Sequence, residues 1–571
     1  MPYVASMIIA AVIYLCLHAL PIRADTAVPV ATDPVAESLR HRLETLGQAG
    51  ELEAGGQVLL ATELLQDLYE ARSYATLWLQ DRRPLTEALM QLPDAIRSAR
   101  DEGLRPEDYH LDALEQSLSR VLSSNGDLEP RHYVDLELLA SDAFLTLARH
   151  FADGKVDPLV IDPKWFVQAT DTSLLPHLYA ALKAENVPVK AALERLLPTH
   201  HTYVALRARL AMQRALRDSE SWTIVDPGPA LRRGDSGVRV NALARRLAEL
   251  GDIATAWANG DAFDTAVEVA VQRFQRRHGL NADGVVGART LAELNVSPEQ
   301  RIDQLKVNLE RWRWLPRDLG PEYLMVNIAS FEMSVHAEGT EVLRQPVAVG
   351  LPFRMTPVFS HRMTYLVLNP SWEVPPRLAA QDHLPLIRKD PSYLEQMGFT
   401  VLKGWGSAEE EIDPANVDWL AVTPRAFPFR LRQKPGPLNA LGQVKFMFPN
   451  VHNVYLHDTP ARGVFAHADR AISSGCIRLS DPMALVDWLL VRRPAVATLD
   501  PDQIRAIIDS GRETTVRLSR PLPVHLLYWT AWIEDDDVVH YAEDVYRRDG
   551  AVLEALLGAA PAVSTPTPFI R

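Results

Sequence analysis

Cysteine is nearly missing from this sequence, since 571 residues contain only Cys16 and Cys476. A disulfide-rich scaffold is therefore excluded, because two cysteines form at most one bridge. The zinc-binding pattern H-E-x-x-H, cysteine pairs at zinc-ligand spacing and the serine-nucleophile pattern G-x-S-x-G are missing as well. These absences argue against zinc peptidases and serine hydrolases, and they leave one thiol in the body of the chain to be explained.

Basic charge and long apolar runs are also scarce. The formal net charge of −14 argues against a dedicated nucleic-acid binder. One long apolar run covers residues 4–20, and Ala24 offers a small residue for cleavage before Asp25. We expect residues 1–24 to be a secretory signal, although its start has no Lys or Arg; an uncleaved inner-membrane anchor is the alternative. Either reading exports the rest of the chain to the periplasm or cell envelope.

Export makes the scarcity of cysteine more informative. If Cys16 leaves with the signal, the mature protein keeps Cys476 alone, and that thiol has no internal partner for a disulfide. A lone cysteine in an oxidising compartment is either a buried inert thiol or a nucleophile. The surroundings of Cys476 decide between these two readings.

Length and changes of pattern predict a multidomain α+β protein. Residues 25–60 are polar, and we expect a tether that leads into a first helix. Residues 61–224 show helical spacing and predict a helical domain without a catalytic constellation. Residues 322–530 alternate apolar and polar positions, as strands do. Residues 376–440 interrupt them with a Pro- and charge-rich insertion, which is either a functional lid or a disordered loop. Residues 531–571 are expected to form a C-terminal tail.

A compact helical unit is predicted between these domains, at residues 231–296. It contains, in order, "LRRGDSGVRV", "AVQRFQRRHGL" and "DGVVGARTLAELN". Val267, Val271 and Phe274 fall on one helical face, and Gly279 ends that helix. The three ordered motifs resemble the three-helix peptidoglycan-binding module found beside many cell-wall enzymes; a generic helical bundle is the alternative.

The local sequence around Cys476 favours a nucleophile. In "RAISSGCIRLSDP", Gly475 permits a tight turn in which backbone N–H groups converge, as an oxyanion hole requires. Asp481 and Pro482 predict the start of a helix shortly afterwards. We expect the positive end of that helix dipole to favour the thiolate.

A cysteine nucleophile also needs a base, and His452, His457 and His467 are close in sequence. His457 ends the strand-like run "NVYLH" and would project from a sheet edge, although such a residue is often structural. His467 is expected in an exposed polar loop. The spacing of the three matches no usual zinc site. The order His before Cys is the reverse of that in papain-like proteases.

The stretch "YLHDTP…RAISSGCIRLSDP" resembles the active-site signature of the L,D-transpeptidases, the YkuD-like cysteine enzymes of bacterial cell walls. The flanking motifs "TPVFSHRMTYLVLNPSWEVP" and "LGQVKFMFPN" agree with it. The long insertion and the helical N-terminal region resemble the large lid-bearing branch, which has scaffold and peptidoglycan-binding domains. Many relatives have His where this chain has Ser474, but the lid-bearing branch resembles this chain in having Ser there.

The resemblance implies roles for individual residues. Cys476 would be the nucleophile and His457 the general base and acid. The backbone amides of Gly475 and Cys476 would hold the oxyanion, with Ser474 beside them. A backbone carbonyl or the Asp458 side chain would orient His457. Arg478 would bind a substrate carboxylate or pair within its loop, while Tyr455 and Trp372 would be cleft walls or core aromatics.

The resemblance also implies substrates and partners. A tetrapeptide stem of peptidoglycan would donate its acyl group through a Cys thioester, and the diaminopimelate amine of a neighbouring stem would accept it, giving a 3→3 cross-link. No cofactor is implied. Carbapenems are expected as covalent inhibitors, and cell-wall synthesis proteins as further partners. A hydrolase on the same fold and a non-catalytic peptidoglycan-binding scaffold are the alternatives.

Overall fold

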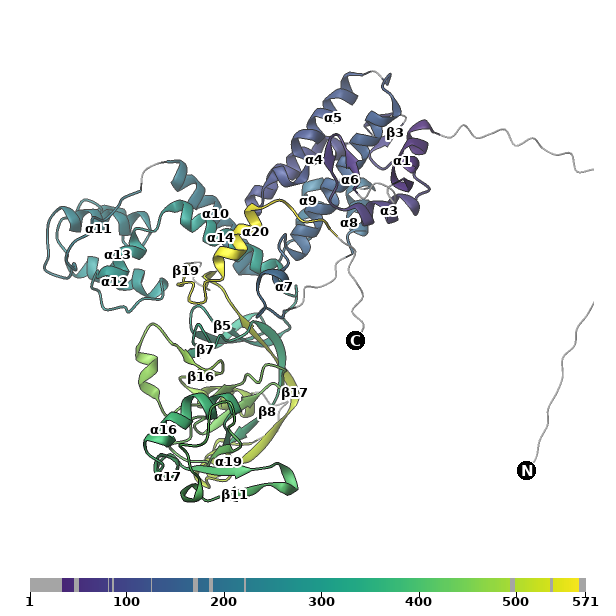
Figure 1. The fold of residues 1–571 in the computed structure, drawn as a ribbon. Coiled ribbons are helices and arrows are strands. Elements are labelled where there is room, and N and C mark those ends of the chain that lie inside the picture. Colours follow the sequence, from purple (N-terminus) through teal and green to yellow (C-terminus); the bar gives the residue numbers. More distant parts are fainter. Residues whose placement is uncertain are drawn as a thin grey trace, which may run out of the picture.

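The computed structural model describes residues 33–45, 51–80, 82–84, 87–124, 126–167, 173–183, 188–219, 222–492, 499–534 and 538–563. It has a helical lobe formed by the first part of the chain, a small helical lobe and a larger β-rich lobe (Figure 1). The predicted multidomain α+β organisation is therefore confirmed. The expected signal at residues 1–24 lies outside the described residues. None of the described helices is both long enough and apolar enough to span a membrane.

The first lobe is built around one long central helix, α6 (Pro130–Asp153), which is buried along most of its length. Around it pack α1 (Pro34–Glu44), α3 (Thr62–Glu70), α4 (Glu87–Arg97), α5 (Leu111–Ser123) and α9 (Val189–Glu194). The helix α8 (Leu175–Lys183) packs against α9, α10 (His201–Asp218) packs against α14, and the lobe also contains the short hairpins β1–β2 (Glu53–Ala54, Gln57–Val58) and β3–β4 (Leu79–Gln80, Arg83–Pro84). The expected tether is wrong for residues 34–44. Val35, Leu39 and Leu43 of α1 are buried against this lobe, because their three- and four-residue spacing places them on one helical face.

The small lobe has its own hydrophobic core and three main helices, α11 (Val238–Glu249), α12 (Thr265–Arg277) and α13 (Ala288–Leu294). The predicted face of Val267, Val271 and Phe274 is buried there. A left-handed backbone at Gly279 follows the end of α12. The three-helix unit expected from the motifs is therefore present.

The helix α14 (Pro298–Arg313) leads from the small lobe into the β-rich lobe and packs against α10. A capping box of Ser297 and Gln300 begins it. Near its end Glu310 and Arg313 form a fully buried ion pair (2.6 Å), and the Glu310 carboxylate also accepts the Val156 N–H at 2.7 Å. One continuous hydrophobic core runs through the helical and β-rich lobes. The two lobes are therefore joined by burial and not only by the chain.

The β-rich lobe is a nine-stranded sheet that closes on itself. Its order is β15-β7-β16-β14-β13-β8-β17-β5-β6, and β6 pairs again with β7. The strands are β5 (Glu322–Asn327), β6 (Glu332–Ala337), β7 (Thr340–Gly350), β8 (Phe359–Leu368), β13 (Val444–Met447), β14 (Leu456–His457), β15 (Ala471–Ser473), β16 (Ile477–Leu479) and β17 (Thr514–Leu527). Helices α18 (Pro482–Leu490) and α19 (Pro501–Asp509) lie between β16 and β17 in the chain.

The insertion folds as a subdomain with its own sheet and core, so the reading as a disordered loop is wrong. Its strands are β9 (Trp372–Glu373), β10 (Phe399–Lys403), β11 (Glu410–Ile412) and β12 (Arg430–Gln433); its helices are α15 (Pro376–Leu378), α16 (Leu384–Lys389) and α17 (Tyr393–Gln396), with a π-helical turn at Ala379–His383. Leu384, Ile387 and Leu431 are fully buried in that core. A separate apolar core keeps the insertion ordered despite its prolines and charges.

The C-terminal part contains two short strands and a helix up to residue 563. Hairpin β18–β19 (Ala531–Ile533, Val539–Tyr541) and helix α20 (Asp549–Leu557) pack between the lobes (Figure 1). The buried Lys155 amine donates to Asp108 and to the carbonyls of Leu556 and Gly558, each at 2.7 Å. These bonds fix the end of α20 against the helical lobe.

Candidate active site

His457 and Cys476 lie on the same face of two neighbouring parallel strands. The register of β14 and β16 pairs Leu456 with Ile477 and His457 with Arg478. Leu456 and Ile477 are fully buried on the inner face of the sheet. Because side chains alternate along a strand, the opposite face carries Tyr455, His457, Cys476 and Arg478. The predicted nucleophile and base therefore lie on one face, with Cys476 next to Tyr455 and His457 next to Arg478.

The orientation of His457 is fixed by a backbone carbonyl. Its Nδ1 donates to the carbonyl oxygen of Asp458 at 2.5 Å. The Asp458 carboxylate has other partners, namely the N–H groups of Gln443 (2.8 Å) and Thr459 (2.6 Å) and the Arg462 guanidinium. Of the two orienting groups that the sequence left open, the carbonyl is the one found. Nε2 is left to accept a proton.

The protonation state of His457 follows from burial. Burial lowers its pKa to about 3, and the Arg478 and Lys445 cations add to this effect, while the bond to the Asp458 carbonyl opposes it. The imidazole is therefore neutral at pH 7. A neutral imidazole is the form that can accept a proton from a thiol.

The Cys476 thiol is half-buried, and burial raises its pKa. Four groups oppose that rise: the Tyr455 backbone, the Tyr455 hydroxyl, and the Lys445 and Arg478 cations. Lys445 lies over the Tyr455 ring, 5.0 Å from its centroid. The thiol thus sits in an electropositive surrounding of the kind that favours reactive cysteines.

The expected helix dipole is not the source of this field. Helix α18 begins at Pro482 with Asp481 as its N-cap, as predicted. However, strand β16 separates that cap from Cys476 by about 10 Å of extended chain. A helix dipole acts mainly within the first turn. Side-chain cations supply the charge that the sequence reading assigned to the helix.

The expected oxyanion hole is found only in part. The Gly475 N–H already donates to Ser473 Oγ at 3.1 Å, and Ser473 Oγ donates to the Cys476 carbonyl at 2.5 Å. The Cys476 N–H has no hydrogen-bond acceptor among the described residues. Gly475 adopts a left-handed φ of 117°, which a residue with a Cβ rarely takes. The turn therefore leaves the Cys476 amide, and not the Gly475 amide, for a developing oxyanion.

Ser474 joins the catalytic loop to the insertion. Its hydroxyl accepts a hydrogen bond from Arg354 Nη1 at 2.9 Å, and the same guanidinium pairs with Asp382 of the insertion at 2.5 and 2.7 Å. Ser474 itself is exposed. It serves here as a contact point for Arg354, and no bond from it to the thiol is found among the described residues.

The insertion also reaches the thiol through two aromatic side chains. Trp372 of β9 interacts with the Tyr455 hydroxyl and lowers its pKa, and that hydroxyl in turn interacts with Cys476. The Trp372 ring also packs against His383 and Phe399, so it belongs to the insertion core. Its role as a wall of a substrate cleft stays a prediction.

Arg478 has no carboxylate partner in the described part of the chain, and its buried Nε has no acceptor there. Pairing within its own loop is not observed. The other two histidines lie elsewhere: His452 packs between Phe166 and Phe359, with ring centroids 4.2 and 5.0 Å away, and His467 is exposed. No cluster of metal ligands occurs among the described residues.

Sequence reasoning missed several residues around the thiol. Lys445 lies in the quoted motif "LGQVKFMFPN", and its pairing with His457 across β13 and β14 places it at the site. Gly442 in that motif has a φ of 58°, and a Cβ there would lie 2.2 Å from the Asp458 carboxylate. Ser473 and Arg354 gave no signal, because only long-range packing brings them to the turn.

Comparison with known proteins agrees with this geometry. Family models match residues 63–210 as "Scaffold domain", residues 236–294 as "Putative peptidoglycan binding domain" and residues 321–497 as "L,D-transpeptidase catalytic domain". Residues 321–497, which make up most of the β-rich lobe, are thus similar to the L,D-transpeptidase catalytic domain of the YkuD type. The three matches follow one another in the chain in the order scaffold, peptidoglycan-binding and catalytic domain.

Individual relatives cover parts of the chain. A Haemophilus influenzae protein named "Putative L,D-transpeptidase" is 35% identical over 254 residues, which are 44% of this chain and half of that protein. An L,D-transpeptidase structure from Mycobacterium smegmatis is 14% identical, covers 36% of this chain and 58% of its own, and has a TM-score of 0.17. One from Stackebrandtia nassauensis is also 14% identical, covers 54% and 97%, and has a TM-score of 0.21. The domain assignment rests on the family models.

Proposed function

We propose that this protein is a cysteine L,D-transpeptidase that forms 3→3 cross-links between peptidoglycan stem peptides. One observation carries the proposal. Strands β14 and β16 hold His457 and Cys476 on one face, with the imidazole oriented by the Asp458 carbonyl and the thiol surrounded by Lys445 and Arg478. A thiol and a neutral base on one face are two of the elements that nucleophilic catalysis by cysteine uses.

The first half-reaction makes a thioester. His457 Nε2 takes the thiol proton as Cys476 Sγ attacks the carbonyl carbon of the third stem residue, diaminopimelate. The carbonyl oxygen becomes an oxyanion, for which the Cys476 N–H is the available donor. The tetrahedral intermediate then expels D-Ala, whose amine takes the proton from His457. The products are a free amino acid and an acyl-enzyme, and no electrons are exchanged with a cofactor.

The second half-reaction passes the acyl group to an amine. The side-chain amine of diaminopimelate in a neighbouring stem attacks the thioester carbon and loses a proton to His457. The C–S bond breaks, and the proton returns from His457 to the departing sulfur. An amide forms between the two stems, and Cys476 is regenerated as a thiol. Water in place of the amine would make the same site a hydrolase.

Substrate contacts are proposed on the same face. Arg478 is the candidate for a stem carboxylate, because its buried Nε has no acceptor in the described structure. Tyr455 and Trp372 line the approach to the thiol. The peptidoglycan-binding domain would hold the wall near the site, and cell-wall synthesis proteins would be partners. This substrate requires the chain to be exported to the cell envelope, as expected for residues 1–24.

The test uses purified protein and disaccharide-tetrapeptide. Transfer predicts a cross-linked dimer and released D-Ala, whereas tripeptide monomer alone supports the hydrolase. Meropenem is expected to add one covalent group to the wild-type protein, as detected by intact mass, and none to Cys476→Ala. A wild-type protein without an adduct, or a Cys476→Ala protein with an equal adduct, would overturn the enzyme reading in favour of a wall-binding scaffold.

A further inference from the structure

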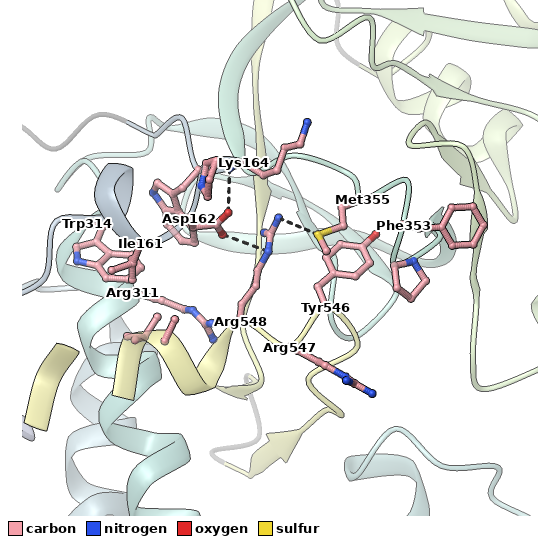
Figure 2. Close-up of a pocket in the computed structure, with 15 residues that line it drawn as sticks. Ile161, Asp162, Lys164, Arg311, Trp314, Phe353, Met355, Tyr546, Arg547 and Arg548 are labelled. Carbon is pink, nitrogen blue, oxygen red and sulfur yellow. Dashed lines mark hydrogen bonds and ion pairs between the residues drawn. The ribbon is translucent and has the colours of Figure 1, made fainter. Parts of the chain in front are cut away.

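A cavity of about 400 Å³ lies where the helical lobe, α14, the segment before α20 and the β7–β8 loop meet. In Figure 2, Trp314 and Arg311 line one side of this space, and Met355 and Phe353 line the other. Arg548 reaches into the middle. The volume is in the range of small-molecule sites, and most of the walls are apolar or aromatic. The catalytic cysteine and histidine do not line it.

The walls of this cavity contain buried donors without acceptors. Nε1 of Trp165, Nε of Arg311 and Nη1 of Arg548 have no hydrogen-bond partner among the described residues. Trp165 is only 2% exposed and Arg311 only 1%. All three groups are N–H donors, and an unpaired buried donor is costly to the fold. A ligand whose acceptor oxygens reach these shielded donors would satisfy them, whereas a cation or a hydrocarbon would not.

The charge of the cavity points the same way. Asp162 pairs with Arg548 at 3.1 Å, and Asp549 pairs with Arg311 at 2.7 Å. Arg547 and Lys164 also line the cavity, and neither has a carboxylate within ion-pair distance in the described part of the chain. Four cationic side chains therefore face two carboxylates. The surplus positive charge selects for an anion.

We propose that this cavity binds a small amphiphilic anion. Its carboxylate or phosphate group lies against the arginines, where guanidinium groups form charge-assisted hydrogen bonds. Its apolar body, preferably an aromatic ring, lies between Trp314 and the side chains of Phe353 and Met355. Phosphate and carboxylate share this chemistry, and the experiment below separates them.

The β7–β8 loop connects this cavity to the catalytic turn. Phe353 and Met355 line the cavity, whereas the alternate residues contact the turn: Arg354 donates to Ser474, and Thr356 Oγ1 donates to the Gly475 carbonyl at 2.9 Å. Successive residues of the loop thus alternate between the cavity and the catalytic turn. A ligand that displaces one set of side chains also displaces the other.

Tyr546 fastens the same loop from the cavity side. Its hydroxyl donates to the Gly350 carbonyl at 2.6 Å and accepts the Thr356 N–H at 3.2 Å. The bond from Thr356 then reaches the residue next to Cys476. We therefore infer that the bound anion changes the reactivity of the thiol, which makes the cavity a regulatory site.

Binding is tested on the full-length protein by calorimetry with phenyl phosphate and phenylacetate. Inorganic phosphate and phenol serve as the two halves of the first probe. We expect at least one aromatic anion to bind about tenfold or more tightly than either half. Phenyl phosphate alone indicates a phosphate ligand, and phenylacetate alone indicates a carboxylate ligand.

Two variants locate the site. Arg547→Glu reverses an exposed charge at the cavity, and Ala551→Trp places a large ring in its exposed wall. Each should weaken binding about tenfold or more, and Arg120→Glu, an exposed charge reversal on α5, should not. Equal binding to all proteins, or no binding of either aromatic anion to the wild type, overturns the site and identifies a water-filled structural cavity.

Coupling is tested by the rate at which iodoacetamide alkylates Cys476, which does not depend on any transpeptidase activity. Saturating aromatic anion should change this rate at least about twofold in the wild type and leave it unchanged in Arg547→Glu. Binding without a rate change overturns the regulatory role and leaves a ligand site only.

Discussion

The Nδ1 atom of His457 lies 2.5 Å from the carbonyl oxygen of the next residue, Asp458. A backbone carbonyl, held in turn by the three side-chain bonds of Asp458, thus fixes the tautomer of the imidazole. The orientation of the base depends on the path of the main chain after β14. Substitutions that displace this segment should therefore impair the base without touching either catalytic side chain.

Gly442→Ala is the sharpest such substitution. A Cβ at this position would lie 2.2 Å from Asp458 Oδ2, and the backbone φ is 58°. We expect Asp458 and its carbonyl to shift, and the rate of Cys476 acylation by meropenem to fall about tenfold or more. Stability should fall by about 1 kcal/mol or more. Gly463→Ala, which has open space around its Cβ, is the control. If the Gly442→Ala protein is folded and Asp458 is displaced, an unchanged acylation rate contradicts the role of the Asp458 carbonyl in orienting His457.

Tyr455→Phe should make the thiol harder to ionise. The Tyr455 hydroxyl interacts with Cys476 and opposes the rise in its pKa that burial causes. Without it we expect the pH profile of iodoacetamide alkylation to move to higher pH, and the rate at pH 7 to fall several-fold. Trp372→Phe removes the interaction of the indole with the same hydroxyl and should have a smaller effect. Tyr365→Phe, on β8, is the control, and a profile that moves equally in it would exclude a specific interaction.

Arg354→Gln should release the insertion from the catalytic turn. The guanidinium joins Ser474 to Asp382, and it is the shared partner of both. We expect faster hydrogen exchange in residues 376–389, while the core of the insertion, with buried Leu384 and Ile387, stays protected.

The matched control is Arg377→Gln, which lies on the same segment and whose hydrogen bond within the described structure goes to its neighbour Gln381. Asp382→Asn should reproduce the effect of Arg354→Gln, because it removes the other half of the ion pair. Unchanged exchange in both pair variants would show that other contacts hold the insertion closed.

Acid should destabilise the protein through its buried histidines. Burial lowers the pKa of His150 to about 3, against 6.5 for an exposed histidine. The unfolded chain therefore binds more protons between these two values, so stability falls as the pH drops below about 6.5. The protonation of His150 alone should lower the free energy of unfolding by about 2 kcal/mol between pH 6.5 and 5.

The measurement is urea unfolding at pH 7 and pH 5. His150→Gln should be less stable than the wild type at pH 7, because a buried bond to Tyr109 changes, but its further loss between the two pH values should be smaller. His41→Gln, at an exposed position on α1, should keep the wild-type slope. An identical slope in His150→Gln would rule out this histidine as a source of the acid sensitivity.

The sequence by itself determined the domain classes and the two candidate catalytic residues. These predictions rest on local properties of the sequence, namely helical spacing, strand alternation and the turn signals of the three binding-module motifs. The local structures that such patterns predict are the ones found in the folded protein. His457 and Cys476 could also be predicted from the sequence, because His457 ends a short strand and Cys476 directly precedes one. Their catalytic roles stay a prediction until the adduct experiment is done.

Only the tertiary structure decided what surrounds the thiol. Pairing of β13 with β14 places Lys445 beside His457. Strand β16 lies between Cys476 and the start of helix α18, so the helix dipole is distant from the thiol. The Gly475 amide is already used by Ser473, so the oxyanion donor differs from the expected pair. Each of these facts depends on strand register and on a turn closed by distant residues. Register is set by which apolar faces can be buried together, and no short stretch of sequence records that choice.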